Sequence, residues 1–92
     1  MIVRIATEGQ YRVSSDALDK LNAIDNQLVD VIARGDENAY RDLFQNLIET
    51  VRGSGQPVPL AEIVESDLVL PASDTTLAEA RHLFRGDGLI PG

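Results

Sequence analysis

The alternation of apolar and polar residues at the start of the chain predicts a β-hairpin. Val3 and Ile5 fall on the same face of an extended strand, and the polar Arg4 falls on the other face. Glu8 and the following glycine supply a turn, after which residues 10–13 give a returning strand. The sequence therefore predicts a hairpin over residues 2–13.

Two amphipathic helices are predicted after the hairpin. The Ser-Ser-Asp run at residues 14–16 is a helix start, and apolar residues recur at helical spacing to about Arg34, where Gly35 can adopt the left-handed cap conformation. Asp36 is the expected N-cap of the second helix, which the glycines of residues 53–55 end. A connection this short makes the helices antiparallel neighbours. Their expected apolar faces are Leu18, Leu21, Ile24 or Leu28, Val31 and Ile32 in the first helix, and Tyr40, Leu43, Phe44, Leu47, Ile48 and Val51 in the second.

The pattern changes after residue 55, where three prolines interrupt regular structure. Residues 60–64 could form a short helical turn, and residues 68–70 a third strand that Pro71 ends. The Thr-Leu-Ala-Glu run at residues 76–79 has capping-box spacing and predicts a last helix to about Arg85.

These elements predict an α+β fold in which an N-terminal β-hairpin packs on two antiparallel helices, with a possible third strand and a short C-terminal helix. A length of 92 residues corresponds to one domain, residues 1–92. The expected core comprises Val3, Ile5, Leu18, Leu21, Leu28, Val31, Leu43, Phe44, Leu47, Val51, Leu77 and Phe84.

Composition adds limits on where the protein acts. The absence of cysteine excludes disulfides and thiolate metal sites. No signal peptide is expected, because Arg4 interrupts the only N-terminal apolar run and no small-residue cleavage site follows. No apolar run approaches the roughly 18 residues that a membrane-spanning helix needs. We therefore expect a cytoplasmic protein without direct membrane insertion.

The net charge of −7 argues against nucleic-acid binding, which usually needs a basic surface. It argues equally against direct docking on anionic lipid. A DNA-binding helix-turn-helix would need a basic recognition helix, and the last helix offers only Arg81 and Arg85 against Glu79. An acidic partner-binding surface remains open, as does the simpler interpretation that the charge keeps a small protein soluble.

The titratable residues show no spacing typical of catalysis. His82 is the single histidine of the sequence, and Glu79 three residues before it favours an ordinary surface contact over a functional pair. No calcium-loop or zinc-protease pattern of carboxylates occurs. The glycines at residues 53–55 follow a helix and lack the later Lys-Ser/Thr of a phosphate loop, so they predict a helix stop. The sequence predicts no catalytic residue, no cofactor and no metal site.

Tyr11 and Arg12 in the second strand carry an alternative. They point to opposite faces, and together with nearby carboxylates they could form a small-ligand sensor or minor enzyme. The simpler expectation is that Tyr11 packs on the core while Arg12 is solvated or pairs with Glu8 or a helix carboxylate. The edge strand could also accept a strand from a partner.

An acidic stretch suggests a partner-binding site. Residues 56–74 carry four carboxylates and no basic residue, with apolar residues between prolines. Charge would steer a partner, and apolar side chains of this stretch and of the chain end would supply contact area. The alternative is that Leu68 and Leu70 are core residues of a strand and the acids are merely solvated. The candidate partner-binding residues are Glu62, Glu65, Asp67, Leu68, Leu70, Leu89 and Ile90.

Three runs of residues resemble one known family. They are MIVRIATEGQYR at residues 1–12, SDLVLP at 66–71, and TLAEAR at 76–81 followed by GLIPG at 88–92. Together they are similar to the small PspA-associated proteins, PspAA, which accompany phage shock protein A, the coiled-coil protein of the membrane-stress response. The runs carry no known catalytic role, so no active-site residue transfers.

The resemblance implies a non-enzymatic accessory or regulatory protein of the phage-shock envelope-stress response. Its implied partner is a phage shock protein A-like coiled-coil protein, through which it would be recruited to the inner membrane surface. The acidic balance agrees, because membrane-surface helices often carry basic stretches. Whether the protein forms a homodimer is left open.

Overall fold

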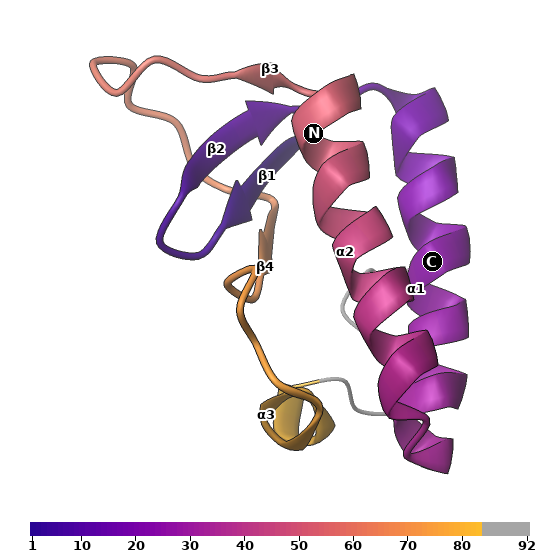
Figure 1. Cartoon of the computed structure of the whole chain (residues 1–92). Helices are drawn as coiled ribbons and strands as arrows, with labels where there is room; N and C mark the ends of the chain where they lie inside the picture. Colours follow the sequence, from indigo (N-terminus) through magenta and orange to yellow (C-terminus); the bar gives the residue numbers. More distant parts are fainter. Residues whose placement is uncertain (84–92) are drawn as a thin grey trace.

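In the computed structural model, which describes residues 1–83, a small sheet lies to one side of two long helices (Figure 1). The elements in chain order are β1 (Ile2–Ile5), β2 (Gly9–Arg12), α1 (Ser15–Arg34), α2 (Glu37–Ser54), β3 (Gln56–Pro57), β4 (Leu68–Leu70) and α3 (Leu77–Leu83). The predicted α+β class is confirmed, with its hairpin, its helix pair, its strand at residues 68–70 and its short helix after residue 76.

The sheet joins segments that are far apart in the chain. Its strand order is β3-β2-β1-β4, with β1 antiparallel to β2 and parallel to β4. The parallel register aligns Val3 with Leu68 and Ile5 with Leu70, so their side chains share the core face. At the other edge, β3 pairs Pro57 with Tyr11 of β2. Neither the parallel pairing nor β3 was expected from the sequence.

The helices begin and end at the residues that the sequence indicates. Ser14 and Asp36 are the N-caps of α1 and α2, and their side-chain oxygens accept hydrogen bonds from the amides three residues later at 3.3 and 3.1 Å. Gly35 ends α1 with a left-handed φ of 71°, a conformation that glycine adopts without strain. Thr76 and Glu79 form the reciprocal bonds of a capping box at the start of α3.

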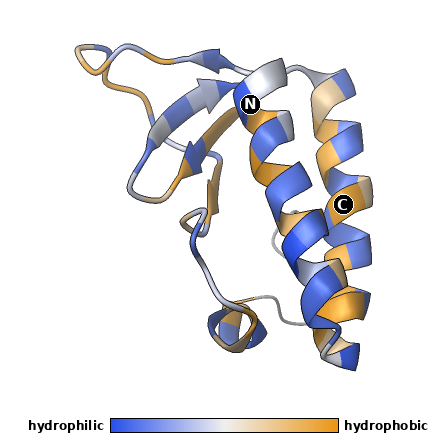
Figure 2. Ribbon diagram, viewed as in Figure 1, coloured by the Kyte–Doolittle hydropathy of each residue, from blue (hydrophilic) through white to orange (hydrophobic). Residues whose placement is uncertain are grey.

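The core lies between the two helices and one face of the sheet, where the apolar sides of α1 and α2 turn inward (Figure 2). Most of the predicted core residues are buried, and Leu18 and Leu43 are partly buried against them. Phe84 lies outside the described residues. The side chains that are completely buried include Val3, Ile5, Leu21, Leu28, Leu47, Ile48, Val51 and Leu70.

The expected helical turn at residues 60–64 is wrong. Instead, a single turn in which the Glu62 amide donates to the Pro59 carbonyl at 3.0 Å interrupts a long irregular connection between β3 and β4. Leu60 and Ile63 find no apolar surface to cover, and a short helix is stabilised mainly by packing of its apolar face. The connection projects beyond the hairpin (Figure 1). We call residues 58–67 the projecting loop.

Among residues 1–83, no helix combines the length and the apolar character that crossing a membrane requires.

Candidate functional site

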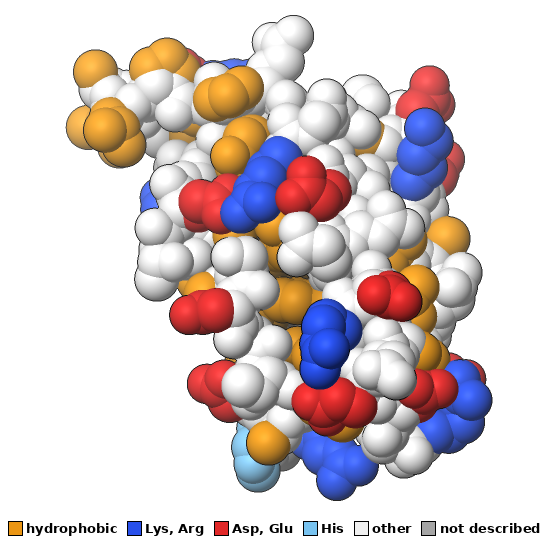
Figure 3. All heavy atoms as spheres, viewed as in Figure 1, with side chains coloured by type: hydrophobic (Ala, Val, Ile, Leu, Met, Phe, Trp, Pro, Cys, Tyr) orange, Lys and Arg blue, Asp and Glu red, His pale blue; other side chains and the backbone are white. Residues whose placement is uncertain are grey.

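The projecting loop exposes two large aliphatic side chains at its tip. Leu60 is 101% exposed and Ile63 is 97% exposed, whereas the aliphatic residues of the helices largely face the core. Apolar side chains accordingly gather at the upper left of the molecule, where the loop projects (Figure 3). This exposure costs the isolated protein hydrophobic free energy that burial against a second surface would recover.

Polar bonds to β2 hold the projecting loop in place. The Val58 amide donates to the Gln10 carbonyl at 2.9 Å. The Gln10 side-chain amide donates to the Val64 carbonyl at 3.0 Å and to the Ser66 hydroxyl at 2.9 Å. Arg12 of the same strand forms an ion pair with Glu62. The loop is therefore positioned without burying its two exposed aliphatic side chains.

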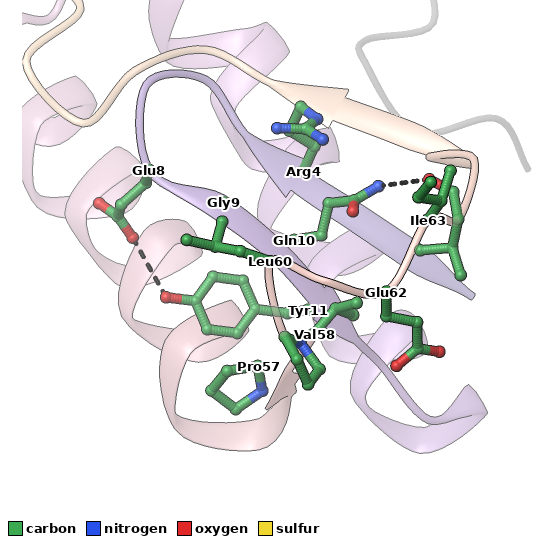
Figure 4. A pocket seen from close by; sticks show the side chains of 12 residues that line it. Arg4, Glu8, Gly9, Gln10, Tyr11, Pro57, Val58, Leu60, Glu62 and Ile63 are labelled. Carbon is green, nitrogen blue, oxygen red and sulfur yellow. Dashed lines mark hydrogen bonds between the residues drawn. The ribbon is translucent and has the colours of Figure 1, made fainter.

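A cavity of about 470 Å³ separates the projecting loop from the hairpin (Figure 4). Arg4, Gln10 and Tyr11 contribute to its lining from the sheet. Leu60 and Ile63 contribute from the projecting loop. The lining is therefore mixed, with a cation and a phenol beside aliphatic groups.

A cluster of charged side chains at one end of this cavity fastens the hairpin turn to α2. Arg52 pairs with Glu8, its Nε donating to Oε2 at 2.9 Å, and also pairs with Glu49 at 3.2 Å. The Tyr11 hydroxyl donates to Glu8 Oε2 at 3.3 Å. The hydrogen bond from Arg52 lowers the pKa of Glu8, while burial followed by the Glu8 charge raises the pKa of Tyr11. Both shifts favour the charge states that hold the cluster together.

Two expectations for the hairpin residues are thereby settled. Tyr11 packs partly buried against the core, as the simpler expectation had it. Arg12 is solvated, as one alternative had it, because 49% of its side chain is exposed. Its pairing with Glu8 or a helix carboxylate is wrong, because Arg52 pairs with Glu8 and Arg12 pairs with Glu62 of the projecting loop. A pairing across some 50 residues cannot be read from local spacing.

Arg12 is not among the residues that line the cavity beside His82. His82 lines a separate cavity of about 510 Å³ in α3, together with Glu37, Leu77 and Arg81. Within residues 1–83, no three histidine or carboxylate side chains gather closely enough to hold a metal ion.

The predicted acidic residues fall in two groups. Glu62 and Glu65 are exposed on the projecting loop. Asp67 instead accepts a hydrogen bond from the Ile2 amide at 2.7 Å, while its own amide donates to the Ile2 carbonyl at 2.8 Å. Asp67 thus fastens the start of β1 to the start of β4.

The predicted apolar partner-binding residues are not open to a partner where the structure describes them. Leu68 is 7% exposed and Leu70 is completely buried, because the parallel register with β1 turns both toward the core. Leu89 and Ile90 lie outside the described residues. The exposed large aliphatic residues of the acidic stretch are instead Leu60, Ile63 and, at 55% exposure, Val69 of β4. The sequence analysis did not single out any of the three. Pro57 and Pro59, which come just before Leu60, were the available signal.

The fold and the site define a small α+β protein in which a helix pair covers one face of a mixed sheet and a positioned apolar loop extends from the sheet edge. The chain belongs to the PspA-associated protein family, PspAA, whose model matches residues 1–92. The resemblance found in the sequence is thereby confirmed. No curated protein and no solved structure matches the chain.

Proposed function

We propose that this protein is a non-enzymatic accessory or regulatory protein of the phage-shock envelope-stress response and acts by binding PspA. The observation that carries the proposal is the match of the PspA-associated family over residues 1–92. In this role the protein works in the cytoplasm and reaches the inner membrane surface through its coiled-coil partner.

The charge of the chain supports a protein partner of this kind. A net charge of −7 repels anionic lipid and nucleic acid but attracts a basic helix. Helices that lie on membrane surfaces are rich in Lys and Arg. The acidic protein is therefore suited to bind the partner rather than the membrane.

The state of the polar groups around the hairpin supports a non-catalytic role. Glu8, the carboxylate nearest the Tyr11 hydroxyl, is occupied by Arg52, which holds the pKa of Glu8 below its ordinary value. A carboxylate of lowered pKa is a weak general base at neutral pH. Glu8 thus serves to hold the hairpin on α2, whereas a catalytic carboxylate would have to be free to contact a substrate.

One observation favours a second candidate function, the sensing of a small ligand. The cavity of about 470 Å³ beside Arg4 and Tyr11 falls within the size range of small-molecule sites. An anionic ligand would pair with Arg4. Such a ligand would raise the melting temperature of the wild type and not that of Arg4→Gln, whereas PspA binding requires no ligand.

Size-exclusion chromatography with light scattering tests the proposed function. The purified chain is mixed with purified PspA, and we expect the two to elute together with a mass equal to that of a complex. Separate elution at every mixing ratio would contradict the proposal. The chain alone decides the question of a homodimer, because a monomer has a mass of 10.0 kDa and a dimer twice that.

A further inference from the structure

We propose that the projecting loop is the partner-binding surface and that Leu60 and Ile63 pack against the apolar stripe of a basic helix of the partner. This inference rests on the proposed function and specifies the surface and the chemistry through which it operates.

The exposure of Leu60 and Ile63 is the first argument. Single exposed aliphatic residues are common on protein surfaces. Here two of them are 101% and 97% exposed and lie three positions apart on one projecting segment. Neighbouring exposed apolar residues with a polar rim are typical of interaction sites. The rim in this case is Glu62 and Glu65, both exposed.

The second argument is that the projecting loop is already positioned for binding. Gln10 donates to Val64 and Ser66 at 3.0 and 2.9 Å, and Arg12 pairs with Glu62. A segment that is held before binding loses less conformational entropy when its partner arrives. These bonds therefore favour the use of the loop as a docking element.

Charge selects among the possible occupants. Residues 56–67 carry Glu62, Glu65 and Asp67 and no Lys or Arg. Glu62 pairs with Arg12 and Asp67 accepts from the Ile2 amide, so the exposed Glu65 and the net charge of −7 are what a basic partner would meet. Anionic lipid is disfavoured, because lipid binding uses basic residues. A second copy is disfavoured, because each chain carries −7 and would bring the same acidic loop. A partner surface bearing Lys and Arg is the complementary choice.

The backbone of the loop argues for a helix rather than an added strand. Strand addition requires a row of free amide donors at a sheet edge. The loop connects the two edge strands of the sheet, β3 and β4, which have only two and three residues. Pro57 and Pro59 lie at one end of the loop, and Pro71 follows β4. Proline has no amide hydrogen to donate. Such short, proline-flanked edges favour recognition through side chains, as when the apolar face of a helix packs into a complementary surface.

The test measures the affinity of full-length variants for purified PspA by isothermal titration calorimetry. The double variant Leu60→Ser and Ile63→Ser should bind about ten- to a hundredfold more weakly for each buried side chain lost. Its melting temperature should stay that of the wild type, because both side chains are fully exposed. The matched control is Leu83→Ser, which changes a 47% exposed leucine of α3 and should leave the affinity unchanged.

A second set of variants tests the charge. Glu65→Gln should slow association at low ionic strength and leaves the Arg12–Glu62 pair in place. Asp19→Asn and Asp42→Asn, each made singly, change the net charge equally at exposed helix positions and should slow association less. An effect of Glu65→Gln no larger than theirs would overturn the role assigned to the acid of the projecting loop.

The outcomes separate the inference from the proposed function. If wild-type protein does not bind PspA, both fail. If it binds and the Leu60/Ile63 double variant binds equally well, the projecting loop is not the docking surface and only this inference fails. If the wild-type chain alone has the mass of a dimer and the double variant has the mass of a monomer, the loop serves self-association. Co-flotation with phosphatidylglycerol vesicles, lost in the double variant, would assign it to lipid. Either result would overturn the proposal of a basic helix.

Discussion

Individual polar side chains connect the irregular segments of this protein to its helices and strands. Gln10 connects the projecting loop to β2, and Asp67 connects the start of β4 to β1. Tyr40 does so for the segment before α3, since its hydroxyl donates to the Thr75 carbonyl at 2.6 Å while its ring stacks on Phe44 with centroids 5.6 Å apart. Each contact joins groups that local sequence patterns do not relate.

Replacing Tyr40 by phenylalanine isolates one such hydrogen bond, because the stacked ring is kept. We expect the free energy of unfolding at pH 7 to fall by about 1 kcal/mol. Burial, and then the charges of Glu79 and Glu37, raise the pKa of Tyr40 from its ordinary 10.0 to about 12. Because the folded-state pKa lies above the unfolded one, this contribution is complete below pH 10 and is lost as the pH rises through 12.

Urea unfolding at pH 7, 10 and 12 measures this effect. The stability advantage of the wild type over Tyr40→Phe should shrink between pH 10 and pH 12. Comparing the two proteins cancels the titration of Tyr11 and the other groups that they share. An advantage that stayed constant across this interval would show that the Tyr40 hydroxyl is not the group responsible.

At the scale of the elements, α2 connects the parts of the fold. It packs on α1, and it contacts α3 and β3 near its two ends. Its apolar face is centred on Phe44, which is 3% exposed. Loss of packing on this face should therefore be felt by the whole domain.

Phe44→Ala should lower the free energy of unfolding by about 2–5 kcal/mol, because it removes a buried ring and leaves a cavity. That is a large part of the 5–15 kcal/mol typical of a folded domain. Asp42→Ala, an exposed position on the same helix, is the control and should change stability by less than about 0.5 kcal/mol. An unchanged melting temperature in Phe44→Ala would contradict the assignment of the helix face.

The junction of α2 and β3 gives a prediction with a control two residues away. A β-carbon at Gly55 would lie 2.6 Å from the Val51 carbonyl oxygen and 2.9 Å from Tyr11 Cβ. Gly55→Ala should force the end of α2 away from β2 and cost about 1–3 kcal/mol. Gly53 lies within α2 with nothing near its β-position, so Gly53→Ala should be neutral or stabilising by up to about 1 kcal/mol. Differential scanning calorimetry ranks the three proteins, and the opposite order would contradict this geometry.

The elements that the sequence predicts well are those with a long or local signal. The helices have many turns of periodic apolar residues and explicit caps at Ser14 and Asp36. β3 and the partner of β4 could not be predicted, because strands of two and three residues carry no periodicity and pair with segments far away in the chain.

The candidate site was also predicted incompletely, because the sequence does not show which apolar residues are buried. The sequence at residues 60–64 suggests a short helical turn, because it shows which side chains are apolar. It does not show whether another part of the protein covers them. The structure leaves Leu60 and Ile63 uncovered and buries Leu68 and Leu70. The exposure of Glu62 and Glu65 could be expected, because Glu side chains are rarely fully buried.

At the scale of the whole molecule, the net charge of −7 should set the rate of partner binding. Raising the ionic strength shortens the distance over which charges attract, from about 30 Å at 0.01 M to about 3 Å at 1 M. The association rate with PspA should therefore fall about tenfold or more over this range, while dissociation changes less. Stopped-flow measurement provides the check, and an association rate independent of salt would contradict electrostatic steering.

The place of β4 beside β1 has a consequence for how the chain is made. Ile2 and Asp67, which hydrogen-bond to each other at this junction, are 65 residues apart. At 5–20 residues per second, the ribosome needs about 3–13 s to synthesise the stretch between them. During this interval β1 presents an open backbone edge bearing Val3 and Ile5. The nascent chain is therefore most exposed to aggregation before residue 70 leaves the ribosome, and a chaperone that shields the N-terminal hairpin would act in that period.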